Sequence, residues 1–398
     1  MKTKLLTIYL AVMVIFMFAS IPAAAAQKEL KVGCSMALSG PVSVVGIAWR
    51  NGALIVADYY NQKGGLKVGN DTYKIVIIDG DNKFTPEGAT TSSRRLVERD
   101  GVKLILGGIA TPDTMGVQAV TEPAKIPILH TAAADEPMKD KKYSFRGFVC
   151  FREMMPGLFK WLVSNKPEVK KIALFDMDYE SGYFGHKLAR KMAEIKGLEV
   201  VYDGYFEPGS KDFNSYLLRI LAKKPDVIFN TASPYPTWPI IIKQARALGY
   251  EGLFMENSPP AVADNIKIAG KENLQGLIGF GYGTEGSSIP EGIKDFKKEY
   301  MRLYGEWSNY PLVYVPALYA FFAAVEKANS LDADKIVAVL EDGSDWPIPL
   351  GFTGRFAGAE TYGLPHQWYA PQWVLEVKGD KAVAVDEIPI SDMVTGWD

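Results

Sequence analysis

The chain has 398 residues, a formal net charge of −2 and 48% hydrophobic residues. Because neither charge sign dominates, the composition gives no support to nucleic-acid binding. The three histidines lie far apart in the sequence and make no metal-ligand pattern, so we expect neither a metal nor a cofactor.

Residues 1–26 have the pattern of a secretory signal peptide. Lys2 and Lys4 give a basic start, a run of apolar residues follows, and Ala24 to Ala26 provide small residues for cleavage. The apolar run is shorter than the ~20 residues that a membrane span needs. We therefore expect export, and cleavage after Ala26 would leave 398 − 26 = 372 residues, a length that suits two domains.

The first predicted unit is a strand, a tight turn and a helix. An apolar run at 30–38 ends at Ser39, apolar residues recur at helical spacing between 53 and 60, and Gly64–Gly65 end the helix. This order opens an α/β fold and places Ser39 and the helix N-terminus at the carboxyl end of the strand, where such folds bind ligands. The free N–H groups of a helix N-terminus suit a carboxylate.

Strands and helices then alternate, joined by short turns. The first group has strands at 73–79, 102–106 and 126–129 and helices at 85–100 and near 115–122. After a connector at 143–151, the order recurs with helices at 155–164, 186–196, 212–222 and 240–248 and strands at 171–175, 200–205, 227–230 and 252–255. This alternation predicts parallel sheets with right-handed crossovers.

The last third of the chain does not begin a third domain. It has a strand at 276–282, helices at 291–304, 315–330 and 333–340, and apparent strands at 354–356 and 372–377. If these helices complete the first domain and the last strands complete the second, the chain crosses between domains three times.

We therefore predict an α/β protein with two doubly wound parallel-sheet domains, joined by a three-crossover hinge beneath a ligand cleft. Domain I comprises 27–147 and 277–350, and domain II comprises 148–276 and 351–398.

Several short motifs follow one another along nearly the whole mature chain. They are Lys31-Val32-Gly33 with Leu38-Ser39-Gly40-Pro41, Ala53 to Gly65 with its N-x-x-G-G ending, Gly107-Gly108, Ile126-Pro127, Phe145-Arg146, Tyr183-Phe184-Gly185, Lys243 to Arg246 with Leu248-Gly249, and Thr353-Gly354 with Phe356. In this order and spacing they resemble the type I periplasmic solute-binding proteins of ABC transporters, the branched-chain amino acid (Leu/Ile/Val) binding group. The resemblance implies a periplasmic, non-catalytic protein that binds a small solute and delivers it to an ABC permease.

The resemblance also implies where the solute binds. By position, Thr111 matches a hydroxyl that holds the solute's carboxylate, and Ala132 matches a main-chain contact in the same domain. Phe184 and Tyr235 match aromatic positions of the second domain, and Glu256 lies in the loop that supplies an acid for the solute's ammonium group. Other interpretations stay open: Thr111 as a helix cap, the two aromatics as core, and Glu256 as a solvated loop acid.

The chain also departs from the family's pattern. Val45 stands where a tyrosine is common, Ala134 where a threonine is usual, and His130 and Thr131 replace Ser-Pro, while Trp238 adds apolar surface to the cleft loops. A buried polar ligand group without a partner costs roughly 1–3 kcal/mol, so selection for an amino acid should retain those donors. An aromatic or aliphatic carboxylate, or a small amide, is therefore the alternative solute. His130 suits a hydrogen-bonded structural role as well as a ligand contact.

Other function classes lack their motifs. There is no G-x-S-x-G elbow, phosphate-binding loop or convincing nucleophile–base pair, so we do not expect an enzyme. The glycine-rich run Gly279 to Gly283 opens no helix after its strand, which disfavours dinucleotide binding. A ligand-sensing module that signals to a separate partner is the remaining alternative. We expect Cys34 and Cys150 to be buried thiols rather than a disulfide.

Overall fold

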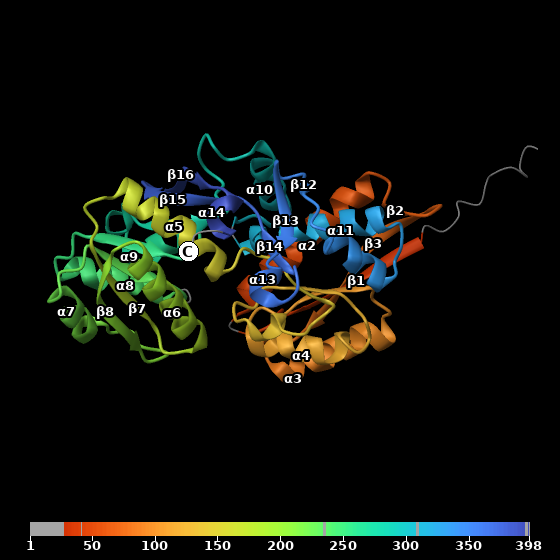
Figure 1. Ribbon diagram of the computed structural model, residues 1–398, viewed down its shortest axis with the longest axis horizontal. Helices are drawn as coiled ribbons and strands as arrows, with labels where there is room; N and C mark the ends of the chain where they lie inside the picture. Colours follow the sequence, from red (N-terminus) through yellow and green to blue (C-terminus); the bar gives the residue numbers. More distant parts are fainter. Residues whose placement is uncertain (1–27, 41, 234–235, 308–309, 395–396, 398) are drawn as a thin grey trace, which may run out of the picture.

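Two sheets organise the chain into two lobes, with helices packed around each (Figure 1). The structure is a computed structural model that describes residues 28–40, 42–233, 236–307, 310–394 and 397. The predicted signal peptide, residues 1–26, lies outside the described residues. Among the helices that the structure describes, none is long and apolar enough to cross a membrane.

The first sheet has nine strands in the order β12-β13-β14-β6-β5-β4-β1-β3-β2. Strands β14, β6, β5, β4, β1 and β3 run parallel, whereas β2, β13 and β12 pair antiparallel with their neighbours. The strands are β1 Lys28–Met36, β2 Leu66–Val68, β3 Asp71–Asp81, β4 Leu104–Gly107, β5 Ile128–His130, β6 Ser144–Arg146, β12 Trp346–Ile348, β13 Phe352–Ala357 and β14 Gln367–Tyr369. The helices of this part are α2 Ser43–Gln62, α3 Pro86–Arg94, α4 Thr111–Thr121, α10 Glu291–Tyr304, α11 Val315–Ala328, α12 Ala333–Leu340 and α13 Ala359–Tyr362.

The second sheet has seven strands in the order β16-β15-β11-β10-β9-β7-β8. Strands β11, β10, β9, β7 and β8 run parallel, and β15 and β16 add an antiparallel edge. The strands are β7 Lys171–Met177, β8 Glu199–Phe206, β9 Val227–Asn230, β10 Leu253–Glu256, β11 Ile278–Gly281, β15 Gln372–Lys378 and β16 Lys381–Ile388. The helices are α5 Phe151–Asn165, α6 Glu180–Ile195, α7 Asn214–Leu221, α8 Thr237–Ala247, α9 Val262–Ala269 and α14 Ile390–Val394.

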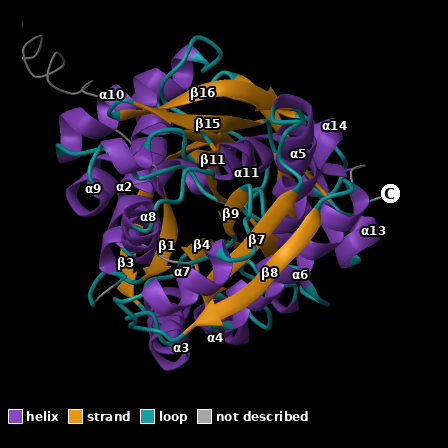
Figure 2. Cartoon of the chain, turned by 90° about the vertical axis from the view of Figure 1, so that its left-hand side faces the viewer, coloured by secondary structure: helices purple, strands orange, loops and turns teal. Residues whose placement is uncertain are grey.

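Side chains along a strand alternate between two hydrophobic cores, because successive residues point to opposite faces of the sheet. In β7, Ile172 and Leu174 belong to one core, whereas Ala173 and Phe175 belong to the other. Helices α5 and α6 cover one side of this sheet and α8 and α9 the other (Figure 2). This continuous burial on both faces confirms the predicted doubly wound sheets.

The strand membership differs from the predicted domain segments. The strand predicted at 276–282 is β11, which pairs in the second sheet rather than in domain I. Strands β13 and β14 pair in the first sheet, although residues from 351 onward were expected in domain II. The connector expected at 143–151 contains β6, the strand that pairs with β5 and β14. Short buried strands next to glycine and proline carry too little periodicity to be assigned to a sheet from sequence.

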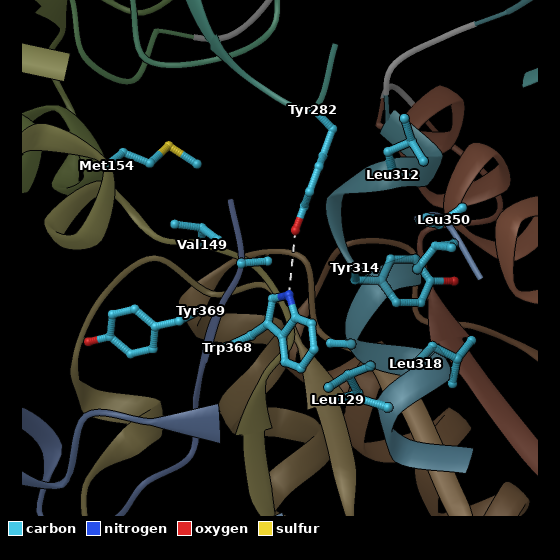
Figure 3. Close-up of a cluster of buried hydrophobic side chains, with 14 of the residues drawn as sticks. Leu129, Val149, Met154, Tyr282, Leu312, Tyr314, Leu318, Leu350, Trp368 and Tyr369 are labelled. Atoms are coloured by element: carbon cyan, nitrogen blue, oxygen red, sulfur yellow. Dashed lines mark hydrogen bonds between the residues drawn. The ribbon is translucent and has the colours of Figure 1, made fainter. Parts of the chain in front are cut away.

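The chain passes between the sheets three times, after β6, after β11 and after β14. Val149, Tyr282 and Trp368, which lie in or beside these three passages, gather in one buried apolar cluster (Figure 3). The indole Nε1 of Trp368 donates to the hydroxyl of Tyr282 at 3.4 Å, which links the second and third passages. These residues are part of the large hydrophobic cluster that continues into both lobes.

Because Trp368 packs closely on β13, adding one methyl group to that strand at Gly354 should lower the stability of the fold. A Cβ atom at Gly354 would lie 2.2 Å from Cζ2 of the Trp368 ring, so Gly354→Ala forces the indole to move. We expect a loss of roughly 1–3 kcal/mol in the free energy of unfolding, measured by urea denaturation. The double variant with Trp368→Phe should recover part of this loss, and strictly additive losses would contradict the packing argument.

Candidate functional site

Asp113 and Asn82 build the carboxyl edge of the first sheet. The buried carboxylate of Asp113 accepts hydrogen bonds from the N–H groups of Ile109 (2.9 Å) and Ala110 (2.8 Å) and from Nδ2 of Asn82 (3.1 Å). Asn82 Nδ2 also donates to the carbonyl of Ser35 at 3.1 Å. Burial raises the pKa of Asp113, and these donors oppose that rise. Two side chains thus join the ends of β1, β3 and β4.

Asp81 accepts hydrogen bonds from the polar groups of the first turn. Its carboxylate accepts from the N–H of Leu38 at 3.0 Å, from the hydroxyl of Ser39 at 2.5 Å and from the N–H of Lys83 at 3.0 Å. Burial acts to raise the pKa of Asp81, but these hydrogen bonds outweigh it and lower the pKa. Ser39, predicted at the ligand-binding edge, lies at that edge with its hydroxyl bonded to a carboxylate of the same chain.

Thr111 is the first residue of α4, directly after the turn that Asp113 shapes. Its side chain is half-buried, and no described residue hydrogen-bonds its hydroxyl. A free hydroxyl at a helix N-terminus, where the helix dipole favours negative charge, suits a carboxylate. Val45 lies half-buried on α2, which follows the neighbouring strand β1.

His130 shapes the loop that follows β5. Its Nδ1 accepts a hydrogen bond from the N–H of Ala132 at 3.2 Å, and its buried Nε2 has no partner. Burial, with Arg146 nearby, lowers the pKa of His130 well below its usual value, so the ring is neutral. Because Nδ1 accepts, the ring proton is assigned to Nε2. In this structure the main-chain N–H of Ala132, the predicted ligand contact, is bonded within the loop.

Asp176 organises the carboxyl edge of the second sheet. Its fully buried carboxylate accepts from the N–H and hydroxyl of Thr231 (both 2.8 Å), from the N–H of Ala232 (3.0 Å) and from the N–H and hydroxyl of Ser233 (both 2.7 Å). The Nε2 atom of His186 lies 3.0 Å from the same carboxylate. Burial alone would raise the pKa of Asp176, but His186 and the other donors lower it. This one side chain fixes residues 231–233, which directly follow β9.

His186 extends the network to a second carboxylate. Its Nδ1 lies 2.7 Å from Oδ1 of Asp203 on β8, and Arg190 on α6 also binds Asp203. Burial acts to raise the pKa of Asp203, and Arg190 and His186 lower it. Helix α6, whose first turns carry Phe184, is therefore held to β7 and β8 through His186 and Arg190.

Glu256 is the last residue of β10 and is buried, with 7% of its surface exposed. Its Oε2 accepts from the hydroxyl of Ser258 at 3.1 Å, whereas its Oε1 has no hydrogen-bond partner. Burial raises the pKa of Glu256 to about 8, against the opposing effect of Ser258. A buried carboxyl with one unpaired oxygen can accept a hydrogen bond from a bound cation or, when protonated, donate one to a neutral group.

The aromatic residues predicted for the site lie in different environments. Phe184 is half-buried and packs against the main hydrophobic cluster. Trp238 is 2% exposed and packs edge-on against Phe254 in the second-lobe core, at a ring-centroid distance of 5.6 Å. Its burial in that core corrects the expectation that it adds apolar surface to the cleft loops. Tyr235 lies outside the described residues.

Sequence reasoning missed the residues that shape these loops. Asp113, Asp176 and His186 contribute through burial and through main-chain donors, which a sequence pattern does not show. The available signal was an acidic residue at the end of an apolar strand, as Asp176 follows 172–175.

The cysteine prediction is confirmed, because Cys34 and Cys150 are both free and buried. Within the described ranges, no group of three or more His, Cys, Asp or Glu side chains is arranged to hold a metal ion.

Comparison with known proteins assigns the chain to a family. The family model described as a periplasmic binding protein matches residues 29–381. The chain belongs to this periplasmic binding protein family. The leucine-specific-binding protein of Salmonella typhimurium is 25% identical over 386 residues, covering 93% of this chain and 98% of that protein.

Solved structures of periplasmic binding proteins share the fold. A leucine-, isoleucine-, valine-, threonine- and alanine-binding protein from Brucella ovis, in a closed conformation, aligns with a TM-score of 0.81 at 19% identity. That alignment covers 92% of this chain and 97% of the other. An ABC transporter solute-binding protein from R. palustris in complex with benzoate aligns with a TM-score of 0.71 at 18% identity, over 91% and 96% of the two chains. The predicted resemblance to the branched-chain amino acid binding group is confirmed.

The network around Asp176 predicts a specific stability loss. Asp176→Asn replaces a carboxylate that accepts six hydrogen bonds by an amide with one acceptor, so we expect a loss of roughly 3 kcal/mol or more in the free energy of unfolding. Asp178→Asn, an exposed change two residues away, is the matched control and should cost little.

The same pair of variants predicts a pH dependence. Because folding lowers the pKa of Asp176, its carboxylate stabilises the fold above the ordinary aspartate pKa of about 3.9 and loses this effect as the pH falls through the folded value. The difference in the free energy of unfolding between the parent and Asp176→Asn should therefore be largest near neutral pH and shrink in acid. Urea denaturation across pH 3–7 measures it, and a difference that grows in acid would contradict the assignment.

Proposed function

We propose that this periplasmic binding protein is the solute-binding component of an ABC importer. It binds a small carboxylate-bearing solute between its lobes. The lobes then close by rotating about the three passages, and the closed protein delivers the solute to the permease subunits. The observation that carries the proposal is a pair of polar groups with unused bonding capacity. Thr111 presents a free hydroxyl at the carboxyl edge of the first sheet, and Glu256 has an unpaired oxygen at that of the second.

The first lobe supplies the carboxylate end of this proposed site. Thr111 stands at the N-terminus of α4, where the helix dipole and the hydroxyl both favour an anion. Asp113 holds the preceding turn through Ile109 and Ala110, so the hydroxyl is positioned before the solute arrives. The second lobe then brings Phe184, and we include Tyr235 by its position in the sequence. These aromatics exclude water, which strengthens each polar contact inside.

An amino acid is the solute that would contact both Thr111 and Glu256. Its carboxylate would bind at Thr111 and its ammonium group at the unpaired oxygen of Glu256. The ammonium group requires ionised Glu256, and burial has raised the pKa of that carboxyl to about 8. Binding an amino acid at neutral pH therefore includes the loss of a proton from Glu256.

An aromatic or aliphatic carboxylate is the second candidate. Glu256 is largely protonated at neutral pH while it is unpaired, and a solute without an ammonium group leaves it in that form. Ala134 contributes no hydroxyl where the family's amino acid binders usually have one, and the R. palustris neighbour was solved with benzoate. The two candidates differ in whether Glu256 ionises on binding.

Glu256 therefore gives a pH test that separates them. Below pH 8, the affinity for leucine should fall by up to about tenfold per pH unit, because Glu256 must lose a proton. The affinity for benzoate should show no such dependence. Titration calorimetry of the mature protein from pH 6 to 8 measures both. Glu256→Gln should lower the affinity for leucine by more than about 100-fold, because it breaks a buried ion pair. The affinity for benzoate should stay unchanged.

Thr111→Val tests the carboxylate end for either solute. Removing one hydrogen bond to a charged group costs roughly 1.5–3 kcal/mol, so affinity should fall by about 10- to 100-fold. Thr361→Val, an exposed change on α13, is the control and should leave affinity unchanged. A thermal-shift screen of amino acids, carboxylates and small amides identifies the solute first. Equal affinity in the parent and Thr111→Val would refute the placement of the carboxylate.

The importer role needs a cellular measurement. Uptake of the solute found in the screen should be lost when the gene is deleted and restored by the parent chain, but not by Thr111→Val at low solute concentration. Unchanged uptake in the deletion strain would instead favour the sensing alternative.

A further inference from the structure

The hinge contains two fully buried ionisable side chains, one basic and one acidic. Arg146, the last residue of β6, and Glu153, in the first turn of α5, are 0% and 1% exposed. They lie on either side of the first passage between the lobes. Taking either charge out of water costs several kcal/mol unless partners are supplied, so a packing role alone does not explain them.

One tyrosine hydroxyl joins the two side chains. Arg146 Nη1 donates to the hydroxyl of Tyr362 at 3.3 Å, and that hydroxyl donates to Oε1 of Glu153 at 2.7 Å. Arg146 Nη1 also donates to Oε1 of Gln367 on β14, at 3.1 Å. Tyr362 and Gln367 belong to the segment that leads into the third passage. The network therefore ties the first passage to the third.

The same region holds the loop that carries Ala132. Arg146 Nη2 donates to the carbonyl of Ala134, and the thiol of Cys150 donates to the carbonyl of Ala133 at 3.3 Å. Arg152 Nη2 donates to Oδ2 of Asp135 at 3.2 Å. Because Cys150 and Arg152 lie at the start of α5, the loop after β5 is bonded directly to the second lobe.

This network does not use all of its bonding capacity. Arg146 Nε and Glu153 Oε2 are buried and have no hydrogen-bond partner, whereas Asp135 Oδ1 lies 3.8 Å from Arg146 Nη2 in an ion pair. Arg146 and Glu153, both within the described part of the chain, form no direct ion pair. A rotation of α5 that brought the free carboxylate oxygen to the free guanidinium N–H would add a charge-assisted hydrogen bond. The network is therefore sensitive to how the lobes are oriented.

We infer that Arg146 and Glu153 are positioning residues that couple the 130–135 loop to the orientation of the second lobe. Any rotation about the first passage moves Glu153, Arg152 and Cys150 relative to Arg146, and the loop must follow or lose its bonds. The inference rests on the proposed function only in treating this loop as part of the solute site. A change in loop 130–135 is then transmitted to the hinge through hydrogen bonds that already exist.

Tyr362→Phe is the sharpest test, because it removes the hydroxyl oxygen that joins Arg146 to Glu153 and keeps the ring. Spin labels on Arg94→Cys in α3 and Lys187→Cys in α6, both exposed positions, report the distance between lobes. Cys34 and Cys150 are buried, and burial raises the pKa of both thiols, so they resist labelling. Pulsed electron resonance then compares the parent and the variant without any solute.

We expect the mean inter-lobe distance in Tyr362→Phe to shift by more than about 2 Å, or a second distance population to appear. Tyr250→Phe, which removes a buried hydroxyl that donates to the carbonyl of Leu253 within the second lobe, should leave the distribution unchanged. Circular dichroism confirms folding. If Tyr362→Phe does not fold, Glu153→Gln is measured in the same way.

Arg146→Lys keeps the charge without the planar fork, and we expect it to give an intermediate distribution. Coinciding distributions for the parent and the folded network variant would overturn the inference. Because no solute is present, that result would leave the proposed function untouched, and failure of the solute screen would leave the hinge result standing.

Discussion

Two buried carboxylates, Asp113 in the first lobe and Asp176 in the second, accept main-chain N–H groups at the carboxyl edges of the sheets. Parallel strands end there in loops whose N–H groups lack a ladder partner, and buried N–H groups without a partner are costly. A carboxylate that accepts several of them removes this cost and fixes the loop geometry. Thr111 and the segment beginning at Thr231 take their positions from this interaction.

The charges at these edges differ in how completely they are paired. Asp113 and Asp176 are well supplied with donors, and the pKa of Asp176 is lowered despite its burial. Glu256 is buried with a single hydroxyl donor, and its pKa is raised. A carboxyl that is buried and only partly paired contributes little to stability, so it is a candidate for ligand binding. The contrast separates the acids that hold the loops from the acid that we propose as a ligand contact.

The hinge combines an apolar cluster with a polar network. Tyr282, Trp368 and Val149 pack together where the passages meet, as part of the hydrophobic cluster that continues into both lobes. The network of Arg146, Glu153 and Tyr362 is directional, because each of its hydrogen bonds depends on angle as well as distance. One neighbour of the same fold is an amino-acid-binding protein and another was solved with benzoate, so the fold alone does not specify the solute.

The sequence by itself determined the class of the fold, the order of its main elements and the family. Apolar strands such as 171–175 and amphipathic helices such as 291–304 have the periodicity that burial on a sheet or helix face requires, and this signal is local. Short strands next to the hinge, β6, β13 and β14, lack it, and only tertiary pairing assigns them to the first sheet. The same is true of Trp238, whose burial in the core no local pattern shows. The tertiary structure alone revealed the pairing of Asp176 with Thr231, and of Arg146 with Tyr362, because hydrogen bonds between residues distant in sequence depend on how the chain folds back on itself.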